Sequence, residues 1–438
     1  MAGGTFTTQN KVRPGVYINF ASAAGSLGSV GNRGTVTLPL SLPWGEAKKI
    51  LTIQAGDDVT KVLGYELSAP QLVLVREALK HAGTLLLYRL NTGVKAAITA
   101  GTLTATAKFG GTKGNAVKIV IEANLDDSEK FDVQTYVDGK LADKQTVATI
   151  ADLAANDWVA FGGTGDLAVT AGAALTGGLD GTVVNQDYVD YLSAIELHDF
   201  QTIALPSTDT TLKSLFVSFV KRLRDVEGRK IQAVLENYPA ADAEGIISVK
   251  NGVQLTDGRV LTPAQATAWV AGATAMAGAN QSLTYTAYDD AADAVPRLTN
   301  SQTELALKNG EWVFTSLNGQ AVVEQDINTF KSYTPEKGKA FSKNRTLRVL
   351  DGLANDWKKI YEAYYIGKVD NNDDGRSLFR NECVKLAEQY QNMGALQNLK
   401  AADDIRVFPG AEADSVAVEA ALQPVDAIEK IYMKVQVK

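Results

Sequence analysis

Helix-like and strand-like patterns alternate along most of this chain, but one long stretch carries strand-like patterns only. Residues 34–40 and 84–90 predict strands on either side of a helix over residues 70–83, and similar alternation resumes after residue 185. In between, residues 96–185 are rich in Thr, Gly and Val and alternate with period two. The alternation of helices and strands predicts a layered α/β core, and the interruption predicts a β-sandwich inserted into it.

The strongest local signal lies inside the interruption. Residues 117–122 and 131–137 alternate apolar and polar side chains, and the dipeptide Asp138–Gly139 follows the second run directly. Both central residues of the tightest hairpin turns need positive φ angles, which Asp-Gly supplies. We therefore expect a two-residue hairpin at this point of the sandwich.

A third region begins after a polar linker near residue 335. Apolar residues recur at three- and four-residue steps from Leu347 to Tyr364, which predicts an amphipathic helix, and residues 377–393 predict a second helix. The predicted fold class is α/β plus β with a C-terminal α+β domain. We expect six segments: an N-terminal arm (1–20), two parts of the α/β core (21–95 and 186–334), the inserted sandwich (96–185), the C-terminal domain (335–427) and a C-terminal strand (428–438).

Charge and hydropathy exclude several classes of protein. The chain holds 43 basic and 50 acidic residues, a formal charge of −7, whereas a general nucleic-acid binder needs a clustered basic surface. The first residues lack the basic and apolar regions of a signal peptide, and no apolar run reaches the ~20 residues that span a bilayer. We expect a protein that folds in the cytoplasm, binds no nucleic acid and does not insert into a membrane.

Groups suited to catalysis are scarce. The two histidines, His81 and His198, both fall near predicted helix ends, where a cation suits the helix dipole. No Gly-x-Ser-x-Gly elbow occurs. The single cysteine, Cys383, cannot form an internal disulfide, and its helical spacing from Phe379 and Leu386 is typical of a core residue. We expect no enzymatic activity, no cofactor and no metal cluster.

One loop matches part of a calcium-binding pattern. Asp370 to Gly375 follows Asp-x-Asn-x-Asp-Gly, with predicted helices on both sides. The twelfth position of such a loop supplies a bidentate glutamate, but Asn381 stands there and Glu382 comes one place late. We favour a tight polar turn between helices, and cation binding stays open at this stage.

The two ends of the chain look like strands. The residues Ile431, Met433, Val435 and Val437 form a wholly aliphatic face up to the penultimate residue, with polar residues between them. Near the start, Val16, Ile18 and Phe20 alternate in the same way after a Pro-Gly turn. Such strands need a core to cover them and a partner for their backbone groups. Either the same molecule or a neighbouring copy could provide both, the latter by strand addition.

Several short sequence blocks occur in a characteristic order. They are Arg-Pro-Gly-Val-Tyr (13–17), Arg-Gly-Thr-Val (33–36), Trp-Gly (44–45), Lys-Asn-Arg-Thr-Leu-Arg-Val-Leu (343–350) leading to Trp357, and the helix over residues 376–393 followed by a short sheet. As an ensemble this order resembles the contractile tail sheath proteins of bacteriophages, phage-like elements and R-type bacteriocins. The resemblance covers essentially the whole chain.

The resemblance implies a structural protein. In this family, subunits stack as rings around an inner tail tube between baseplate and tail terminator proteins, and they exchange N- and C-terminal arms with neighbouring copies. The α/β core is expected to be subtilisin-like in outline but non-catalytic. A helix of the C-terminal domain is expected to face the tube, which makes Arg376 and Arg380, four residues apart on one stripe, the candidate tube contacts. Such a protein is expected in the host cytoplasm during assembly and then in the particle.

A different function that the sequence could serve is that of a secreted β-sandwich protein that binds or hydrolyses glycans. It predicts a secretion signal and either clustered exposed aromatic residues or a facing pair of carboxylates. None of these is evident in the sequence.

Overall fold

The computed structural model of the chain describes residues 2–4, 15–17, 31 and 33–437. The chain divides into two compact units: the first comprises residues 1–30 and 356–423, and the second residues 31–355 and 424–438. The second unit contains the central sheet and the inserted sandwich, and the first contains two long helices and two small sheets.

A seven-stranded sheet forms the centre of the second unit, in the order β19-β15-β14-β13-β3-β5-β4. Its strands are β3 (Thr35–Leu40), β4 (Ile50–Gln54), β5 (Thr84–Arg89), β13 (Thr202–Ala204), β14 (Gln232–Glu236), β15 (Ile246–Val249) and β19 (Glu311–Trp312). Neighbouring strands are parallel except for β4, which is antiparallel to β5. Burial on both faces explains why β3 and β5 are continuous apolar runs.

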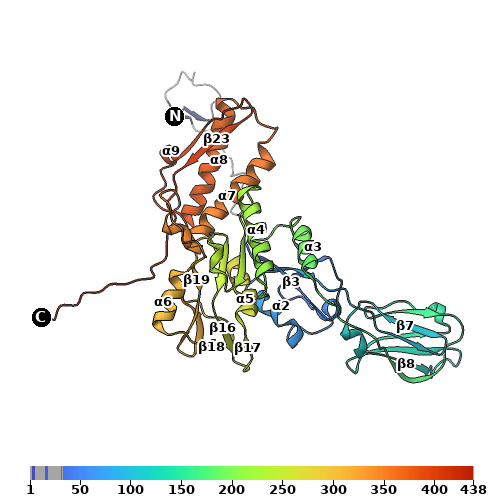
Figure 1. The fold of residues 1–438 in the computed structure, drawn as a ribbon. Coiled ribbons are helices and arrows are strands. Elements are labelled where there is room, and N and C mark those ends of the chain that lie inside the picture. Colours follow the sequence, from blue (N-terminus) through green and yellow to red (C-terminus); the bar gives the residue numbers. More distant parts are fainter. Residues whose placement is uncertain (1, 5–14, 18–30, 32, 438) are drawn as a thin grey trace. The chain divides into compact units, whose positions relative to one another are not determined.

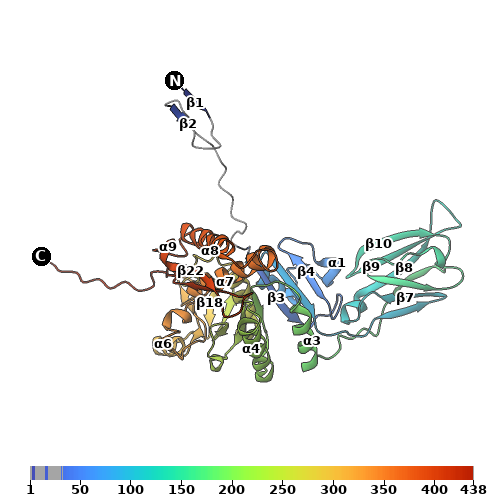
Figure 2. The same ribbon diagram turned by 90° about the horizontal axis from the view of Figure 1, so that it is seen from above.

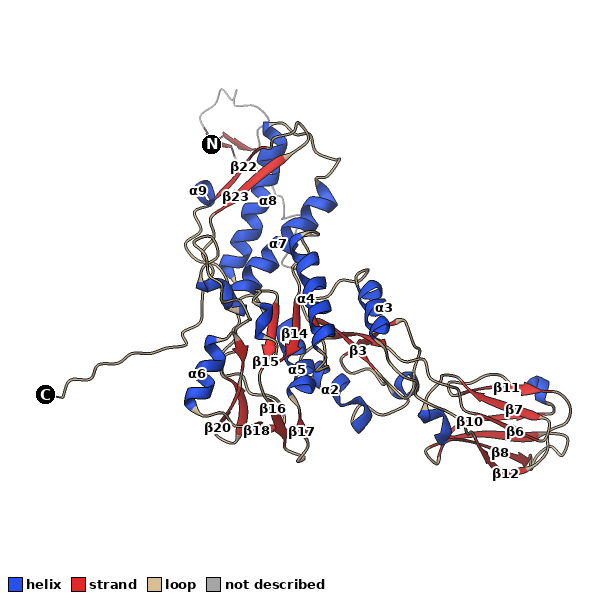
Figure 3. Cartoon of the chain, viewed as in Figure 1, coloured by secondary structure: helices blue, strands red, loops and turns tan. Residues whose placement is uncertain are grey.

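Helices cover both faces of this sheet (Figure 3). On β5, Leu85 and Leu87 join one buried cluster, whereas Leu86 and Tyr88 join the other. The first cluster includes residues of α2 (Val73–Leu79) and α5 (Pro263–Met276), and the second residues of α3 (Asn185–Ile195) and α4 (Thr210–Asp225). The predicted helix over residues 70–83 is shorter than expected, since a 3-10 turn (Pro70–Leu72) precedes α2. This three-layer arrangement confirms the mixed α/β prediction.

Smaller elements complete the second unit. They are the helices α1 (Thr60–Leu63) and α6 (Asn300–Lys308), a sheet of β16 (Gly252–Leu255), β17 (Val260–Leu261) and β18 (Ala291–Val295), the hairpin β20 (Phe314–Leu317) and β21 (Gln320–Val323), and 3-10 turns at Pro239–Ala241 and Lys339–Ser342.

The insertion consists of two sheets packed face to face (Figure 2). The first sheet contains, in order, β10 (Lys140–Val147), β9 (Phe131–Val137), β8 (Val117–Ala123) and β12 (Thr170–Ala174). The second sheet contains β11 (Val159–Gly163), β7 (Leu103–Ala107) and β6 (Ala97–Ala100). Two 3-10 turns, Thr112–Ala116 and Ile150–Asp152, lie between strands of the insertion. Asp138 and Gly139 have φ angles of +50° and +78°, which confirms the predicted hairpin turn. Val117, Ile119 and Ile121 are fully buried between the sheets.

The joint between the core and the insertion is polar and buried. The Arg89 guanidinium, 3% exposed, donates to the carbonyl oxygens of Gly45 (2.5 Å) and Gly110 (2.6 Å). Asn91 accepts from the Leu42 amide (2.8 Å) and donates to its carbonyl (2.9 Å). Since backbone groups on both sides of the joint are tied by the same two side chains, the attachment of the sandwich is fixed by hydrogen bonds as well as packing.

The first unit is built around two antiparallel helices. The first helix, α7 (Asn344–Tyr364), begins in the second unit, and α8 (Asp373–Asn392) follows it. The unit also contains the short helix α9 (Ala401–Asp404) and two small sheets. One sheet is the antiparallel pair β22 (Ile405–Pro409) and β23 (Val416–Ala420), and the other is the parallel pair β1 (Ala2–Gly4) and β2 (Gly15–Tyr17). Phe379 of α8 packs 5.0 Å, centroid to centroid, from both Tyr361 and Tyr365. Asn372 accepts from the Gly375 amide and starts α8 four residues earlier than predicted.

Candidate assembly interface

The C-terminal segment, defined here as residues 428–437, has the predicted strand pattern but no partner strand. It forms no ladder with any strand that the structure describes, and Figure 1 shows its end as extended chain. Its aliphatic residues Ile431, Met433, Val435 and Val437 are 76%, 83%, 81% and 96% exposed. Burying one large aliphatic side chain contributes about 1.5–3 kcal/mol. A row of four left in water is therefore typical of a surface that is covered only on assembly.

Glu429 is the exception in this segment, because its side chain is 10% exposed. Its carboxylate accepts hydrogen bonds from Thr284 Oγ1 (3.0 Å), from Gln325 Nε2 (2.6 Å) and from the Lys343 ammonium. Burial by itself raises the pKa of Glu429, but the three hydrogen bonds and the Lys343 charge together outweigh burial and hold the pKa below its usual range. Sequence reasoning missed this residue, since its partners lie 86 to 145 positions away and leave no local signal.

The N-terminal arm is described only in part. Gly3 of β1 stands opposite Val16 of β2 in a two-stranded parallel sheet. Ile18 and Phe20, the other predicted exchange residues near the start, lie outside the described residues. The structure therefore places one of the three, Val16, in a strand.

The pair β22–β23 offers open edges in the same unit. The two strands pair over five positions with Val407 opposite Val418, and no third described strand joins them. Phe408 and Val418 are 38% and 39% exposed. A two-stranded sheet with apolar exposure and an edge that no third described strand covers can accept a further strand by main-chain hydrogen bonding.

The candidate tube contacts Arg376 and Arg380 are already engaged within their own unit. Arg376 donates to the Asn371 side chain (2.8 Å) and to Asp373, and its side chain is 14% exposed. Arg380 donates to the Ile405 carbonyl (2.7 Å) and to carbonyls of α9. Both arginines thus connect α8 to neighbouring loops and strands, and contact with a tube stays a prediction.

Both histidines lie near helix ends. His81 Nε2 lies 2.7 Å from the Asp289 carboxylate, which also accepts a hydrogen bond from Trp269 Nε1 (3.0 Å). The neighbouring Tyr288 hydroxyl donates to the buried Glu77 carboxylate and not to His81. His198 is exposed after α3, where its carbonyl accepts from Arg229. These contacts hold helix ends in place.

Cys383 is a buried residue of α8, as predicted. Its side chain is 1% exposed, and burial, reinforced by the neighbouring Glu382 charge, raises the pKa of the thiol to about 12. At neutral pH the thiolate needed for nucleophilic chemistry is therefore almost absent.

The loop from Asp370 to Gly375 forms a helix start. Asp373 and Asp374 lie in the first turn of α8, where acidic groups suit the helix dipole, and Asn372 is the N-cap. Among the described residues there is no group of three or more His, Cys, Asp or Glu side chains that could hold a metal ion. No helix of the described chain is long and apolar enough to cross a membrane.

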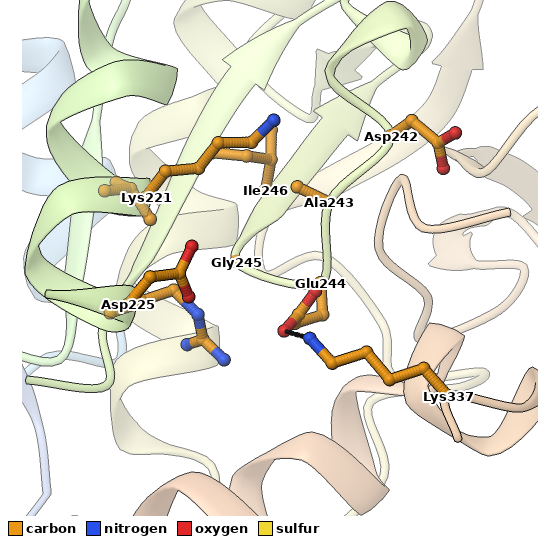
Figure 4. Close-up of a pocket in the computed structure, with 10 residues that line it drawn as sticks. Lys221, Asp225, Asp242, Ala243, Glu244, Gly245, Ile246 and Lys337 are labelled. Atoms are coloured by element: carbon orange, nitrogen blue, oxygen red, sulfur yellow. Dashed lines mark hydrogen bonds and ion pairs between the residues drawn. The ribbon is translucent and has the colours of Figure 1, made fainter. Parts of the chain in front are cut away.

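One small cavity, about 110 Å³, lies beside α4 and the start of β15 (Figure 4). Three of its charged lining residues form ion pairs within the chain: Lys337 Nζ donates to Glu244 (2.7 Å), and Arg224 forms two bonds, 2.6 and 2.9 Å, to Asp351. Burial raises the pKa of Glu244, but the bond from Lys337, a backbone hydrogen bond and the charges of Lys337 and Arg224 together outweigh burial and lower the pKa. Opposite charges that satisfy each other are typical of structural ion pairs rather than of a ligand site.

Comparison with known proteins identifies the family. Consecutive parts of the chain match models for the domain III N-terminal region of tail sheath protein Gp18 (33–90), the phage tail sheath β-sandwich domain (91–180), the central domain (181–329) and the C-terminal domain (336–438). The phage-like element PBSX protein XkdK of Bacillus subtilis (strain 168) is 41% identical over 466 residues, covering all of both chains. The chain belongs to the phage tail sheath family.

Solved tail sheath proteins share the fold along the whole chain. The sheath tail protein of Desulfitobacterium hafniense is 57% identical with a TM-score of 0.88, covering 97% of this chain and 100% of that one. The sheath tail protein of Listeria innocua is 41% identical with a TM-score of 0.79, covering 93% and 95%. The helical sheath of the anti-feeding prophage, solved in its contracted state, shares the fold with a TM-score of 0.56. It is 15% identical in sequence, and the match covers 98% of this chain and 100% of that one.

Proposed function

We propose that this sheath protein assembles as stacked rings around an inner tail tube and contracts to drive that tube through a target envelope. A structural role in a tail sheath follows from family membership. Contraction is supported by the shared fold with a sheath solved in the contracted state. Contraction without fuel requires an extended assembly that is metastable relative to a more tightly packed one, with the difference stored at subunit interfaces.

The observation that carries this proposal is the exposed aliphatic row of the C-terminal segment. Four aliphatic side chains on one face of an extended segment, each at least 76% exposed, need a covering surface that the described subunit does not provide. The open edges of the β22–β23 and β1–β2 sheets supply the backbone partners that such a strand needs in a neighbouring copy. Exchange of arms in both directions would join subunits into a mesh that stays connected while it contracts.

Deletion of residues 431–438 tests the arm exchange. Because the removed aliphatic side chains are exposed in the subunit, we expect the free energy of unfolding to change by less than about 0.5 kcal/mol. Negative-stain microscopy of the truncated protein should show no tubes or stacked rings under conditions where the full chain forms them. Removal of residues 1–20 should have the same effect, since the mesh needs both arms. A truncated chain that still builds contractile sheaths would contradict the proposal. A truncated chain that unfolds would show that the strand packs on the core of its own subunit.

The proposed partners are further copies of this chain, the inner tube protein, and the baseplate and tail terminator proteins at the two ends. We propose no catalytic role, and the subtilisin-like outline of the core remains a prediction. Assembly in the host cytoplasm and later residence in the particle follow from this function.

Contact between α8 and the tube is the least constrained part of the proposal. Since Arg376 and Arg380 also hold their own unit together, charge reversal alone would confuse folding with binding. Replacing both by Lys, or both by Gln, removes the same forked hydrogen bonds, but only the Lys pair keeps the positive charge. If the charge binds the tube, the Lys pair should retain tube-templated assembly and the Gln pair should lose it. Equal assembly of the two variants would tell against this helix.

A further inference from the structure

The C-terminal segment inverts the usual distribution of side chains. Its apolar residues face water, with Ile428 and Tyr432 at 88% and 90% exposed, whereas its acidic residue Glu429 is 10% exposed. Removing a carboxylate from water is costly unless hydrogen bonds and an opposite charge compensate. Three side chains from separate parts of the second unit provide that compensation: Thr284, Gln325 and Lys343, defined here as the Glu429 socket.

The socket is itself held in place by a buried polar network. Thr284 Oγ1 accepts from the Asp326 amide (3.0 Å) and from Ser282 Oγ (3.1 Å). The Asp326 carboxylate, in a residue 1% exposed, accepts from Asn344 (3.0 Å) and from Arg348. Lys343 directly precedes Asn344 at the start of α7, and its carbonyl accepts from the Leu347 amide (3.0 Å).

Because the Thr284 hydroxyl and the Lys343 backbone make these bonds without Glu429, we infer that this part of the socket is preorganised. A preorganised charged site holds its ligand in one geometry at little further entropic cost. The position of Glu429 relative to the core is therefore defined by charge-assisted hydrogen bonds, the stronger class of such bonds in proteins.

We propose that Glu429 is a positioning residue: docked in its socket, it fixes the point and direction from which residues 430–437 leave the subunit to reach a neighbour. This inference rests on the proposed arm exchange. Eight extended residues reach about 26 Å, at ~3.3 Å each. Undocking lengthens the free chain and widens the volume that its end explores. The effective concentration of the arm at its acceptor then falls, roughly as the −3/2 power of tether length.

The first test is Glu429→Gln in the full chain, with Glu336→Gln as a matched control that removes the same charge from an exposed position. Loss of the charge-assisted bonds should shift the docking equilibrium by about 10-fold or more. We expect faster hydrogen exchange at residues 425–430 and a several-fold higher critical concentration for self-assembly, measured by sedimentation. The thermal midpoint of the subunit should be unchanged, and the control should match the unsubstituted chain in all three measurements.

A second variant separates docking from any effect of glutamine itself. Lys343→Met removes the cation and leaves the carboxylate buried without its countercharge, so it should release the segment at least as strongly as Glu429→Gln. The double variant should be no worse than Lys343→Met alone, because the two residues act through one interaction.

The outcomes distinguish the two proposals. Unchanged exchange at residues 425–430 in Glu429→Gln would overturn the socket, and faster exchange with an unchanged critical concentration would overturn its positioning role. Both results leave arm exchange intact. A full chain that builds sheaths after deletion of residues 431–438 would overturn arm exchange and with it the positioning role.

Discussion

Strand β8 of the sandwich and the C-terminal segment carry the same alternation of apolar and polar residues but differ entirely in burial. In β8, Val117, Ile119 and Ile121 are fully buried beneath the facing sheet. In the C-terminal segment, the corresponding row from Ile431 to Val437 is 76–96% exposed. The difference teaches that alternation specifies the geometry of a strand, whereas the fold decides whether its cover comes from the same chain.

The two regions also differ in how they are attached. The sandwich joins the core through several buried bonds of Arg89 and Asn91, so both its position and its interior are settled within the subunit. Within the part of the chain that the structure describes, the C-terminal segment is held through the side chain of Glu429. One region buries its apolar face within the subunit, and the other leaves its apolar face exposed.

The largest effect on the stability of the subunit is expected for Ile119→Asp. This change removes an aliphatic group worth about 1.5–3 kcal/mol and buries an unpaired carboxylate, so the loss should exceed about 4 kcal/mol. Thermal unfolding should show the sandwich melting at least about 15 °C lower. A small loss would mean that the sandwich interior tolerates charge as the C-terminal segment does.

The next largest effect is expected at the joint. In Gly111, φ is +136° and an added Cβ would lie 2.0 Å from the Pro43 carbonyl oxygen, so Gly111→Ala should cost about 2–4 kcal/mol. Gly139→Ala is the matched control: φ is also positive, +78°, but no atom lies within 4 Å, and the cost should be about 1 kcal/mol. Equal losses by chemical denaturation would show that the joint has no special rigidity.

A much smaller effect on stability is expected for Met433→Asp combined with Val435→Asp. Both side chains are more than 80% exposed, so the free energy of unfolding should change by less than about 0.5 kcal/mol, while assembly should be lost. Lys434→Ser with Gln436→Ser changes the other face and should preserve assembly. If the aspartate pair lowered the thermal midpoint as Ile119→Asp does, the two regions would not differ in the way described.

The smallest effect is expected from moderate acidification. The lowered pKa of Glu429 means that docking is favoured above the ordinary value of 4.5 and is lost only as the pH falls through the lower, docked value. The charged groups nearby are Lys343 and Asp426, whose carboxylate lies 3.9 Å from the Lys343 ammonium. Hydrogen-exchange protection at residues 425–430 should therefore stay constant from pH 8 to about pH 5. Release near pH 6 would contradict the charged socket.

Local signals allowed much of the fold to be predicted. The Asp138–Gly139 hairpin depends on the conformational preferences of two adjacent residues, and the amphipathic pattern from Leu347 to Tyr364 depends on the period of the helix itself. The mixed α/β architecture with an inserted sandwich follows from the change of period along the chain.

Long-range contacts could not be predicted in this way. The four-residue spacing of Arg376 and Arg380 placed them on one stripe, but only the fold shows that they bind loop and strand backbone. The buried pair of Arg348 with Asp326, and the docking of Glu429, join residues whose types are common on surfaces. Nothing in their immediate sequence distinguishes them from solvated charges.

The buried thiol of Cys383 makes the chain well suited to chemical labelling. It is the only cysteine among 438 residues, and with a pKa of about 12 it should not react with maleimide at pH 7 in the folded protein. A cysteine introduced by Gln436→Cys, in the exposed C-terminal segment, would then be the single reactive site. An environment-sensitive dye attached there would report, in real time, whether the C-terminal segment moves from water to a dry contact during assembly.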